Sequence, residues 1–396
     1  MGVSAAEQAV LDRIDEASLV DLTTALVRGA GQNPPGDEAA TVNVLRSAAV
    51  ELGLDVVETA VEQGRNNLRV TLAGGSGPGL LLLGHTDVVP VGEGWTTDPF
   101  GGVVRDGRIY GRGASDMKGG LAASLAALAA LRGVGLSGPV ELAALVDEEE
   151  TGKGIRAYIE AYTESAQQSF LGCLTAEPTD LQTIIGARGA SYLRVEIHGK
   201  ACHAGNPDDG ANAIYGAAAV VAEIERLHAE LARRPHPLVG PATWSVGQMH
   251  GGAGGSIVPA ECVVVADRRL LPGESPESVL DGLRERVDGL RLTDRGLTTD
   301  VAMPMEMPAF QTAADSELAL AADAALADVG GPRLPMGGWT AACDGGFVAR
   351  DLGIPVVVLG PGSATSQAHR ADESVEVSEL IVAARAYALS ALRLLR

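Results

Sequence analysis

Four short, mainly apolar runs, each followed by acidic residues or by a loop that ends at histidine, limit what this chain can fold into more than any other feature of its sequence. Short runs of this kind are typical of strands buried on both faces, as in a parallel sheet covered by helices. The runs and the polar residues after them are 80–83 before His85 and Asp87, 140–146 before Asp147, Glu148, Glu149 and Glu150, 171–175 before Glu177, and 354–359 before a Gly/Pro/Ser loop that ends at His369. Because ligands bind beyond the carboxyl ends of such strands, we expect these side chains to share one cleft.

Helical patterns lie between the strands and predict a three-layer α/β/α domain. Apolar positions recur at helical spacing over residues 6–27, 37–52 and 118–131, and a further short strand is expected at 68–72.

Between residues 188 and 306 the pattern changes to strict apolar–polar alternation, which is typical of a sheet with one wetted face. The expected order there is β-α-β-β-α-β, a ferredoxin-like α+β pattern. Its elements after the first strand are a helix at 211–231, strands near 242–249 and 257–267, a helix at 276–287 and a strand near 298–303. We therefore predict an α/β/α domain of residues 1–187 and 307–396, with residues 188–306 inserted as a second domain.

The charge balance excludes several classes of partner. The 396 residues contain 30 Lys and Arg against 51 Asp and Glu, a net charge of −21 at pH 7. Such an acidic surface repels phosphate backbones and anionic lipids, so neither nucleic acid nor a membrane is expected as a partner. The N-terminal residues lack the pattern of a secretory signal, and the four cysteines form no C-x-x-C pair. We expect reduced thiols and a cytoplasmic protein.

Several carboxylates in one cleft would repel one another, and divalent cations would remove that conflict. Histidine and carboxylate without cysteine favour zinc, with cobalt or manganese as alternatives. Asp116 lies in a glycine-rich turn at the start of a helix, where the flexible backbone would leave it free to bridge two ions.

The chain also resembles a known family. The motifs that carry the resemblance are His85-x-Asp87, the Gly-rich loop with Asp116-Met-Lys-Gly-Gly, Asp147-Glu148-Glu149, Ala176-Glu177-Pro178-Thr179 and Gln367-Ala368-His369. Together, and in this order, they resemble the di-zinc amidohydrolases and metallopeptidases, which include acetylornithine deacetylase, succinyl-diaminopimelate desuccinylase, aminoacylase and glutamate carboxypeptidase. The resemblance extends over essentially the whole chain. It implies that the α/β/α domain is catalytic and that the inserted domain serves as a lid and for dimerisation.

The resemblance implies a role for each motif residue. His85 and Glu177 would bind one metal ion and Glu149 and His369 the other, with Asp116 between the two ions. The carboxylate of Asp87 would orient the His85 ring, and Glu148 would be the general base. The run of glutamates leaves a second register open, in which Glu149 and Glu150 are the base and the ligand.

The resemblance further implies that His203 reaches into the active site of a second subunit, so that the protein would be a homodimer. The predicted substrate-binding residues are Asn212, Arg269, Gly362 and Ser363. For Arg269 an ion pair within the inserted domain is an equal alternative, and the amides around Gly362 are expected to donate to the substrate. Ser256 and Cys343 depart from the family pattern, which leaves the side-chain preference open.

The function expected from this resemblance is metal-dependent hydrolysis of the amide bond of an N-acyl amino acid, most similar to acetylornithine deacetylase. Alternatives within the family are a dipeptidase or carboxypeptidase, or a desuccinylase acting like the succinyl-diaminopimelate enzyme. A non-catalytic binding protein with the same fold is a further hypothesis, against which the presence of Glu148 argues.

Overall fold

The computed structural model describes residues 2–165 and 169–396, and it divides the chain into two compact units. The first unit contains the chain up to Gly186 together with Gln311–Gly338 and Cys343–Arg396. The second unit contains Ala187–Phe310 and Trp339–Ala342.

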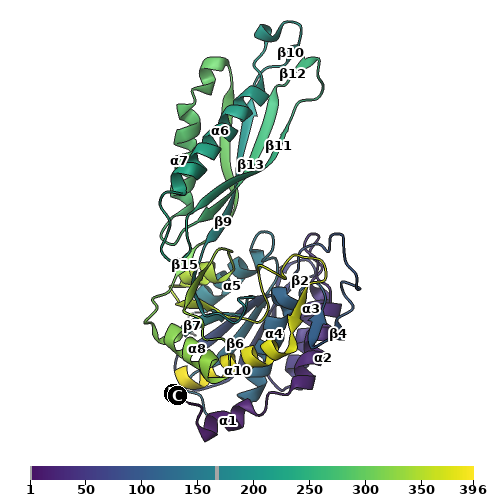
Figure 1. Ribbon diagram of the computed structural model, residues 1–396, viewed down its shortest axis with the longest axis vertical. Coiled ribbons are helices and arrows are strands. Elements are labelled where there is room, and N and C mark those ends of the chain that lie inside the picture. The colour runs from purple at the N-terminus through teal and green to yellow at the C-terminus, as the bar shows by residue number, and fades with distance from the viewer. Residues whose placement is uncertain (1, 166–168) are drawn as a thin grey trace. The chain divides into compact units, whose positions relative to one another are not determined.

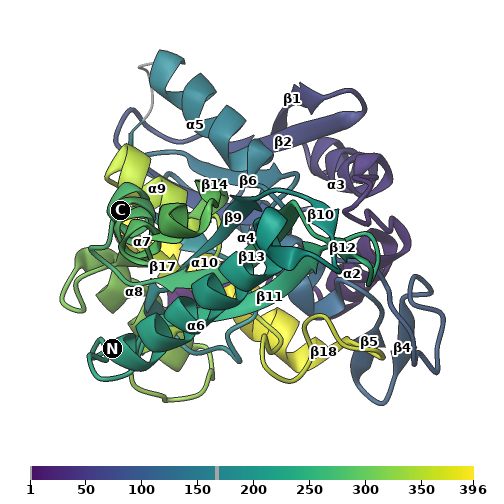
Figure 2. The same cartoon turned by 90° about the horizontal axis from the view of Figure 1, so that it is seen from above.

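The helices of the first unit cover a central sheet (Figure 1). They are α1 (Ala5–Leu11), α2 (Glu16–Arg28), α3 (Ala39–Glu51), α4 (Gly119–Ala130), α5 (Lys153–Ser165), α8 (Glu317–Asp328), α9 (Gly345–Leu352) and α10 (Val377–Leu394). Helix α10 packs against α4 and α8 on one face of the sheet, while α5 and α9 cover the other face (Figure 2). The predicted α/β/α class is confirmed.

The central sheet has the strand order β1-β2-β6-β3-β7-β17-β8-β15, with β16 paired to β8. Its strands are β1 (Asp55–Glu62), β2 (Arg65–Leu72), β3 (Gly79–His85), β6 (Val140–Leu145), β7 (Phe170–Thr175), β8 (Ile184–Ala187), β15 (Phe310–Gln311), β16 (Gly337–Trp339) and β17 (Val356–Val358). A smaller sheet joins β18 (Ser374–Glu376), β5 (Arg108–Tyr110) and β4 (Val103–Arg105).

The four apolar runs form β6, β3, β7 and β17, which are neighbours in the sheet and run parallel. Leu82 on β3 lies opposite Leu142 and Leu174, and all three side chains are buried. Parallel pairing places the carboxyl ends of the four strands at one edge of the sheet, as predicted. This edge is where the polar residues after the strands begin.

The expected single helix over 6–27 is wrong, because the chain forms α1 and α2 with a break between them. The side chain of Asp15 accepts a hydrogen bond from the amide of Ser18 at 2.8 Å and caps the start of α2. Ser4 caps α1 in the same way. Apolar spacing continues through the break, so the capping residues and not the periodicity mark the boundary.

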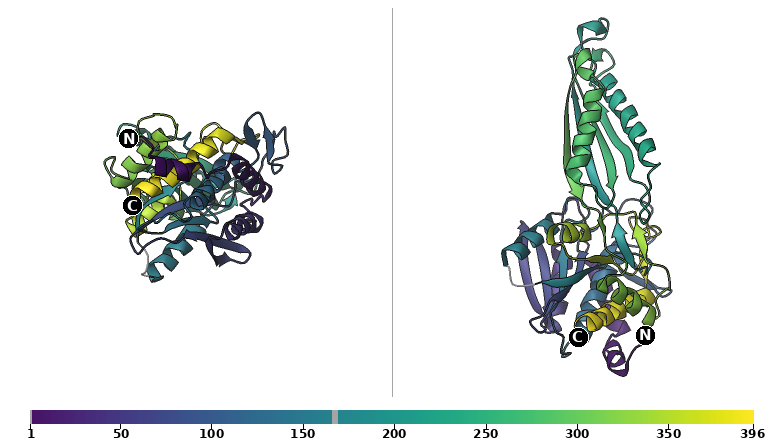
Figure 3. Two further views of the ribbon diagram at one scale, coloured as in Figure 1. Left: turned by 90° about the horizontal axis from the view of Figure 1, so that it is seen from below. Right: turned by 90° about the vertical axis from the view of Figure 1, so that its left-hand side faces the viewer.

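In the second unit, α6 (Ala213–Leu231) and α7 (Pro276–Gly289) pack on an antiparallel sheet of order β11-β13-β9-β14 (Figure 3). The remaining bounds are β9 (Gly189–His198), β10 (Cys202–His203), β11 (Thr243–Gly251), β12 (Ile257–Val258), β13 (Glu261–Leu270) and β14 (Thr298–Met307). The main elements follow the expected β-α-β-β-α-β order. The strand expected at 257–267 is instead two strands, because β12 pairs with β10 and the chain breaks before β13.

Two smaller findings complete the fold. All four cysteines are free thiols. Among the described residues, no helix combines the length and the hydropathy needed to cross a lipid bilayer.

Glu7 joins α1 to the C-terminal helix. Its side chain is buried and accepts a hydrogen bond from Nε of Arg393 at 3.2 Å. Burial opposes ionisation, but hydrogen bonds from Ser4 and from Arg393 outweigh it and lower the pKa of Glu7 to about 2.

We predict that Glu7→Gln lowers the free energy of unfolding by about 1 kcal/mol at pH 7. A carboxyl group with a lower pKa in the folded state stabilises the protein above its unfolded pKa, and this contribution is lost as the pH falls through the folded value. The difference from wild type should therefore shrink as the pH falls from 4.5 to about 2. Urea denaturation across this range measures it, with the exposed Glu93→Gln as control. A difference that does not change with pH would contradict the prediction.

Candidate metal centre

Six of the predicted residues meet at the carboxyl edge of the parallel strands. His85 ends β3, two glutamates follow β6, and a third glutamate follows β7. The other two residues come from the turn before α4 and from the loop after β17. The six are His85, Asp116, Glu148, Glu149, Glu177 and His369.

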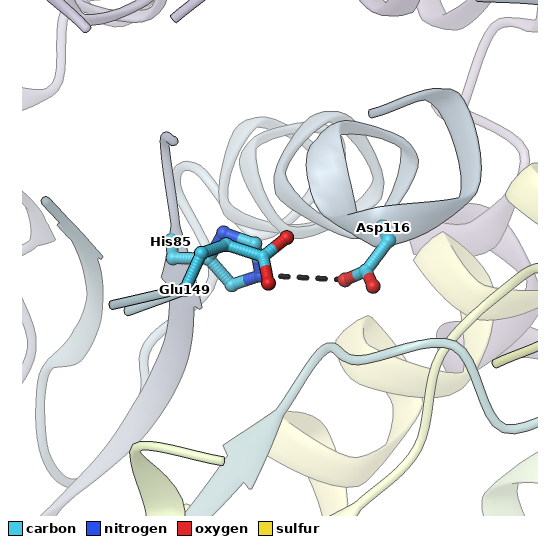
Figure 4. A group of neighbouring side chains, drawn as sticks. All are labelled: His85, Asp116 and Glu149. Carbon is cyan, nitrogen blue, oxygen red and sulfur yellow. Dashed lines mark ion pairs between the residues drawn. The ribbon is translucent and has the colours of Figure 1, made fainter. Parts of the chain in front are cut away.

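Asp116 lies between two imidazole rings. Its Oδ1 is 3.3 Å from Nε2 of His85, and its Oδ2 is 3.4 Å from Nε2 of His369. The two oxygens of one carboxylate thus face two different histidines. Figure 4 shows the Asp116 carboxylate directed towards the ends of the His85 and Glu149 side chains.

Each histidine also faces a second carboxylate. Nε2 of His85 is 3.5 Å from Glu177, and Nε2 of His369 is 3.2 Å from Glu149. Glu148 is somewhat farther away, with its Oε2 3.9 Å from Nε2 of His85. The cluster is therefore two histidine–carboxylate pairs with Asp116 between them and Glu148 beside one of them.

The two registers of the glutamate run differ in the structure. Glu148 is buried and Glu149 is partly buried, and both lie beside the histidines, whereas Glu150 is exposed. This arrangement favours Glu148 and Glu149 as base and ligand. Their roles in catalysis stay a prediction.

Asp87 contacts the His85 ring and also the turn that carries the glutamates. Nδ1 of His85 is 3.0 Å from the main-chain carbonyl oxygen of Asp87 and 3.6 Å from its carboxylate. The carboxylate accepts the backbone amides of Glu148 at 3.2 Å and Glu149 at 3.1 Å. The nearest partner of Nδ1 is thus the carbonyl group. When Nδ1 carries the proton and donates to this group, the unprotonated Nε2 faces the cluster. The carboxylate of Asp87 fixes the turn that carries the two glutamates.

Asn33 holds the carboxylate of Asp87 by a hydrogen bond. Its side-chain amide donates to Asp87 and to Asp147, each at 2.9 Å. Asp147 is also 3.0 Å from Nη2 of Arg65, whose Nε donates to Glu38 at 3.0 Å. Through these buried contacts, the positive charge of Arg65 balances the carboxylates that lie outside the cluster.

The glycine-rich turn holds Asp116 by its backbone shape. Gly113 has φ +84°, which favours glycine, and a Cβ atom there would lie 2.6 Å from Cγ1 of Val88. The predicted need for glycine in this turn is met at Gly113.

The carboxylates strongly affect the histidines. Burial taken alone lowers the pKa of His85, but the negative charge of Glu177 and the bond to Asp116 outweigh it and hold the pKa well above its usual range. Hydrogen bonds to Asp116 and Glu149 raise the pKa of His369 to about 10. The carboxylates around Nε2 of each ring therefore favour a positive charge at that place.

The glutamates of the cluster also have shifted pKa values. Burial raises the pKa of Glu148 and of Glu177 well above the usual range. Oε1 of Glu149 is buried and accepts no hydrogen bond from the described residues. Cations would satisfy such oxygens without protons.

The donor set fits divalent cations. Among the described residues, two groups of three side chains each bring their ligand atoms within 4.8 Å of one another. They are His85 with Asp116 and Glu149, and His85 with Glu148 and Glu177, so they offer only imidazole and carboxylate. These are donors that zinc, cobalt and manganese accept.

The loop of Gly362 and Ser363 lies in the first unit, but its amides are already engaged. The amide of Gly362 donates to Glu379 at 2.7 Å, and that of Ser363 donates to Oγ of Ser115 at 3.0 Å. In this structure these two amides are not free to donate to a substrate, and the part of Gly362 and Ser363 in substrate binding stays a prediction. Gly362 has φ +85°, and a Cβ atom there would lie 2.1 Å from Oγ of Ser115, so this glycine allows the loop to pack closely.

The other predicted site residues belong to the second unit. His203 is exposed, and its Nδ1 accepts the amide of Gly205 at 3.0 Å. Asn212 caps α6, and Nε of Arg269 is 3.0 Å from Asp267, which is the ion pair considered as its alternative. Their part in substrate binding stays a prediction.

The residues that support the cluster through hydrogen bonds and ion pairs were not predicted from the sequence. Asn33, Arg65, Arg112 and Glu373 were not singled out. A usable signal was the position of Glu373, four residues after His369. The contacts of Asn33 with Asp87 and Asp147, and of Arg65 with Glu38 and Asp147, join residues distant in the chain, which no local pattern marks.

The chain is similar to proteins of known families over most of its length. A model of peptidase family M20/M25/M40 matches residues 81–393. Acetylornithine deacetylase from Aliivibrio salmonicida is 31% identical over 344 residues, which cover 86% of this chain and 87% of that protein. Succinyl-diaminopimelate desuccinylase from Dechloromonas aromatica is 30% identical over 355 residues, which cover 87% and 90%.

Solved structures share the fold. Aminopeptidase PepT from Bacillus cereus superposes with a TM-score of 0.77 at 23% identity, covering 97% of this chain and 100% of that chain. The YXEP protein from Bacillus subtilis, a dinuclear metal-binding peptidase from the M20 family, superposes with a TM-score of 0.73 at 18% identity, covering 96% and 98%.

We predict that Asn33→Asp lowers the free energy of unfolding by about 3 kcal/mol, because it replaces a shared donor with a third buried carboxylate beside Asp87 and Asp147. Urea denaturation at pH 8 with a chelator present measures the loss without a contribution from bound ions. Asn66→Asp is the matched control, since its amide donates to Glu58 at the surface. Equal losses of unfolding free energy in the two variants would contradict the prediction, because they would show that burial of the Asn33 site does not matter.

Proposed function

The chain belongs to peptidase family M20/M25/M40, and on that basis we propose that it is a metal-dependent hydrolase that cleaves the amide bond of an N-acyl amino acid. The similarity to acetylornithine deacetylase over most of both chains supports this substrate class. The observation that carries the proposal is the position of Asp116, whose two oxygens face two different histidines. A carboxylate placed in this way suits a pair of metal ions.

In the proposed site, His85 and Glu177 would hold one ion, Glu149 and His369 would hold the other, and Asp116 would serve both. Zinc is the proposed metal, with cobalt or manganese as alternatives. When bound, two divalent ions polarise the amide carbonyl group and make water easier to ionise. The similarity of the fold to a dinuclear metal-binding peptidase supports two ions.

Glu148 is the proposed general base. It is buried, and its Oε2 lies 3.9 Å from Nε2 of His85. It would accept a proton from the attacking water as the new carbon–oxygen bond forms, and return it to the leaving nitrogen as the carbon–nitrogen bond breaks. Asp87 would keep Glu148 in place through the hydrogen bond to its backbone amide.

We also propose that the second unit serves as a lid and for dimerisation, with His203 acting in the active site of the partner subunit. Because Nδ1 of His203 accepts a hydrogen bond, its proton lies on Nε2, where the ring would donate to a developing oxyanion. Asn212 and Arg269 are proposed substrate contacts, as is the hydroxyl group of Ser363. The four free cysteines support a cytoplasmic location.

A second candidate activity is peptide hydrolysis or desuccinylation by the same residues. The desuccinylase from Dechloromonas aromatica is 30% identical, and the fold is similar to that of an aminopeptidase. These activities would use the same metal chemistry and differ in the substrate pocket. A panel of N-acetyl amino acids, N-succinyl amino acids and dipeptides, each with zinc, cobalt or manganese, separates them.

We predict that Glu148→Gln lowers turnover at least about 100-fold while the bound ions are retained, because the proton acceptor is lost and the ligands are not. Turnover of the best substrate and the metal content per chain are the measurements. Glu150→Gln is the matched control, since Glu150 is exposed and should not be needed. The opposite result in this pair would favour the other register.

Two results would contradict the enzyme itself. Wild-type activity that survives complete removal of divalent ions by a chelator is incompatible with a metal-dependent hydrolase. A wild-type protein that binds divalent ions but hydrolyses no substrate of the panel would favour a binding protein that keeps the fold.

We predict that two inactive variants, Glu148→Gln and His203→Ala, regain activity when mixed under conditions of subunit exchange. In a mixed dimer one site has an intact Glu148 and receives His203 from its partner. Random exchange should then restore about a quarter of wild-type activity per chain. If His203 acts within its own chain, the mixture stays inactive.

A further inference from the structure

A buried carboxylate outside the predicted ligand set lies behind the Asp116 turn. Glu373 is fully buried, and its Oε1 accepts the backbone amides of Ser115 at 2.9 Å and Asp116 at 3.0 Å. Its Oε2 accepts a hydrogen bond from Nη1 of Arg112 at 2.7 Å. Both oxygens of Glu373 are therefore held by donors, and two of these donors belong to the backbone that carries Asp116.

Arg112 connects the same carboxylate to the loop of His369. Its side chain is only 2% exposed, and its Nη1 also donates to the carbonyl oxygen of Arg370, the residue after His369, at 3.2 Å. The guanidinium group lies 5.3 Å from the ring centre of Trp95, and its Nη2 donates to Val91 at 3.2 Å. Arg112 thus neutralises Glu373 and fixes the backbone beside His369.

The backbone of Glu373 is fixed as well. Its carbonyl oxygen accepts the amide of Gly111 at 2.8 Å, and β18 begins at the next residue. In the ladder between β18 and β5, Ser374 lies opposite Tyr110. Glu373 therefore enters the site from a paired strand, which leaves its side chain little freedom to move.

We propose that Glu373, with Arg112 as its counter-charge, is a positioning residue that fixes Asp116 relative to His369. Glu373 and Arg112 are 261 residues apart in the chain, and their contact joins the two segments that carry Asp116 and His369. The effect on metal binding rests on the proposed function. Without this contact, the amides of the Asp116 turn lose their acceptor, and the separation of the two ligands is no longer set.

The variant Glu373→Gln tests this, because it keeps the size of the side chain but replaces one acceptor oxygen with a donor. We expect hydrogen exchange of the backbone amides in 113–118 to become faster than in wild type. We also expect the affinity for zinc, measured by competition with a chelator, to fall about 10- to 100-fold. Arg112→Met should change both readouts in the same direction, because it leaves the Glu373 carboxylate without its counter-charge.

Glu141→Gln is the matched control. Glu141 is also fully buried on β6 and paired with an arginine, Arg69, at 2.7 Å, but it lies near the amino end of that strand, away from the cluster. It should change thermal stability without changing zinc affinity or exchange in 113–118. Equal losses of zinc affinity in the two variants would overturn the proposal, because they would show an effect of general destabilisation.

The exchange measurement separates this inference from the proposed function. If the wild-type protein binds no divalent ion, the proposed function fails, and faster exchange in Glu373→Gln still supports the positioning of Asp116. Unchanged exchange in 113–118 overturns the proposal whether or not the protein binds zinc. Faster exchange with unchanged zinc affinity in a protein that binds zinc also overturns it.

Discussion

Carboxylates that lie close together inside a protein repel one another, and this repulsion is the constraint on which the first unit depends. The parallel pairing of β3, β6, β7 and β17 brings the polar residues after these strands to one edge of the sheet. Supporting donors engage the outer carboxylates: Asn33 lies between Asp87 and Asp147, and Arg112 faces Glu373. Among the described residues, the inner carboxylates face the two histidines and one another. The backbone that carries Asp116, Glu148 and Glu149 is held by hydrogen bonds to its amides. A pair of cations fits the charge that is left.

Much of this arrangement was predictable from sequence because it follows from strand ends. Apolar runs predict buried strands, and the residue after a parallel strand must lie at its carboxyl edge, so the meeting of His85 with Glu177 needed no contact information. Asn33 and Glu373 were not predictable in this way, since they act through hydrogen bonds to residues far away in the chain. The break between α1 and α2 was missed for another reason, because apolar spacing runs across it and only the caps mark it. The strand β1 was missed because its side chains are mostly exposed and do not alternate clearly.

The predicted substrate contacts show a different limit. A motif indicates which residues recur together but not which of their atoms are free. The amides of Gly362 and Ser363 donate to Glu379 and Ser115, and Asn212 caps a helix. For Asp87 the motif indicated the residue beside the His85 ring but not that its carbonyl oxygen is nearer to the ring than its carboxylate. The second unit follows its expected strand and helix order because period-two alternation depends on local burial alone.

The late position of the His369 segment has a consequence for the synthesis of the protein. A chain that has left the ribosome only as far as β17 already carries His85, Asp116 and the three glutamates, but it lacks His369 and the strand that follows. Such a nascent chain exposes an acidic cluster with neither its second imidazole nor the Glu373–Arg112 contact. Capture of the proposed pair of ions would therefore be among the last events of maturation, and a chain cut short before this segment would lack one of the proposed ligands.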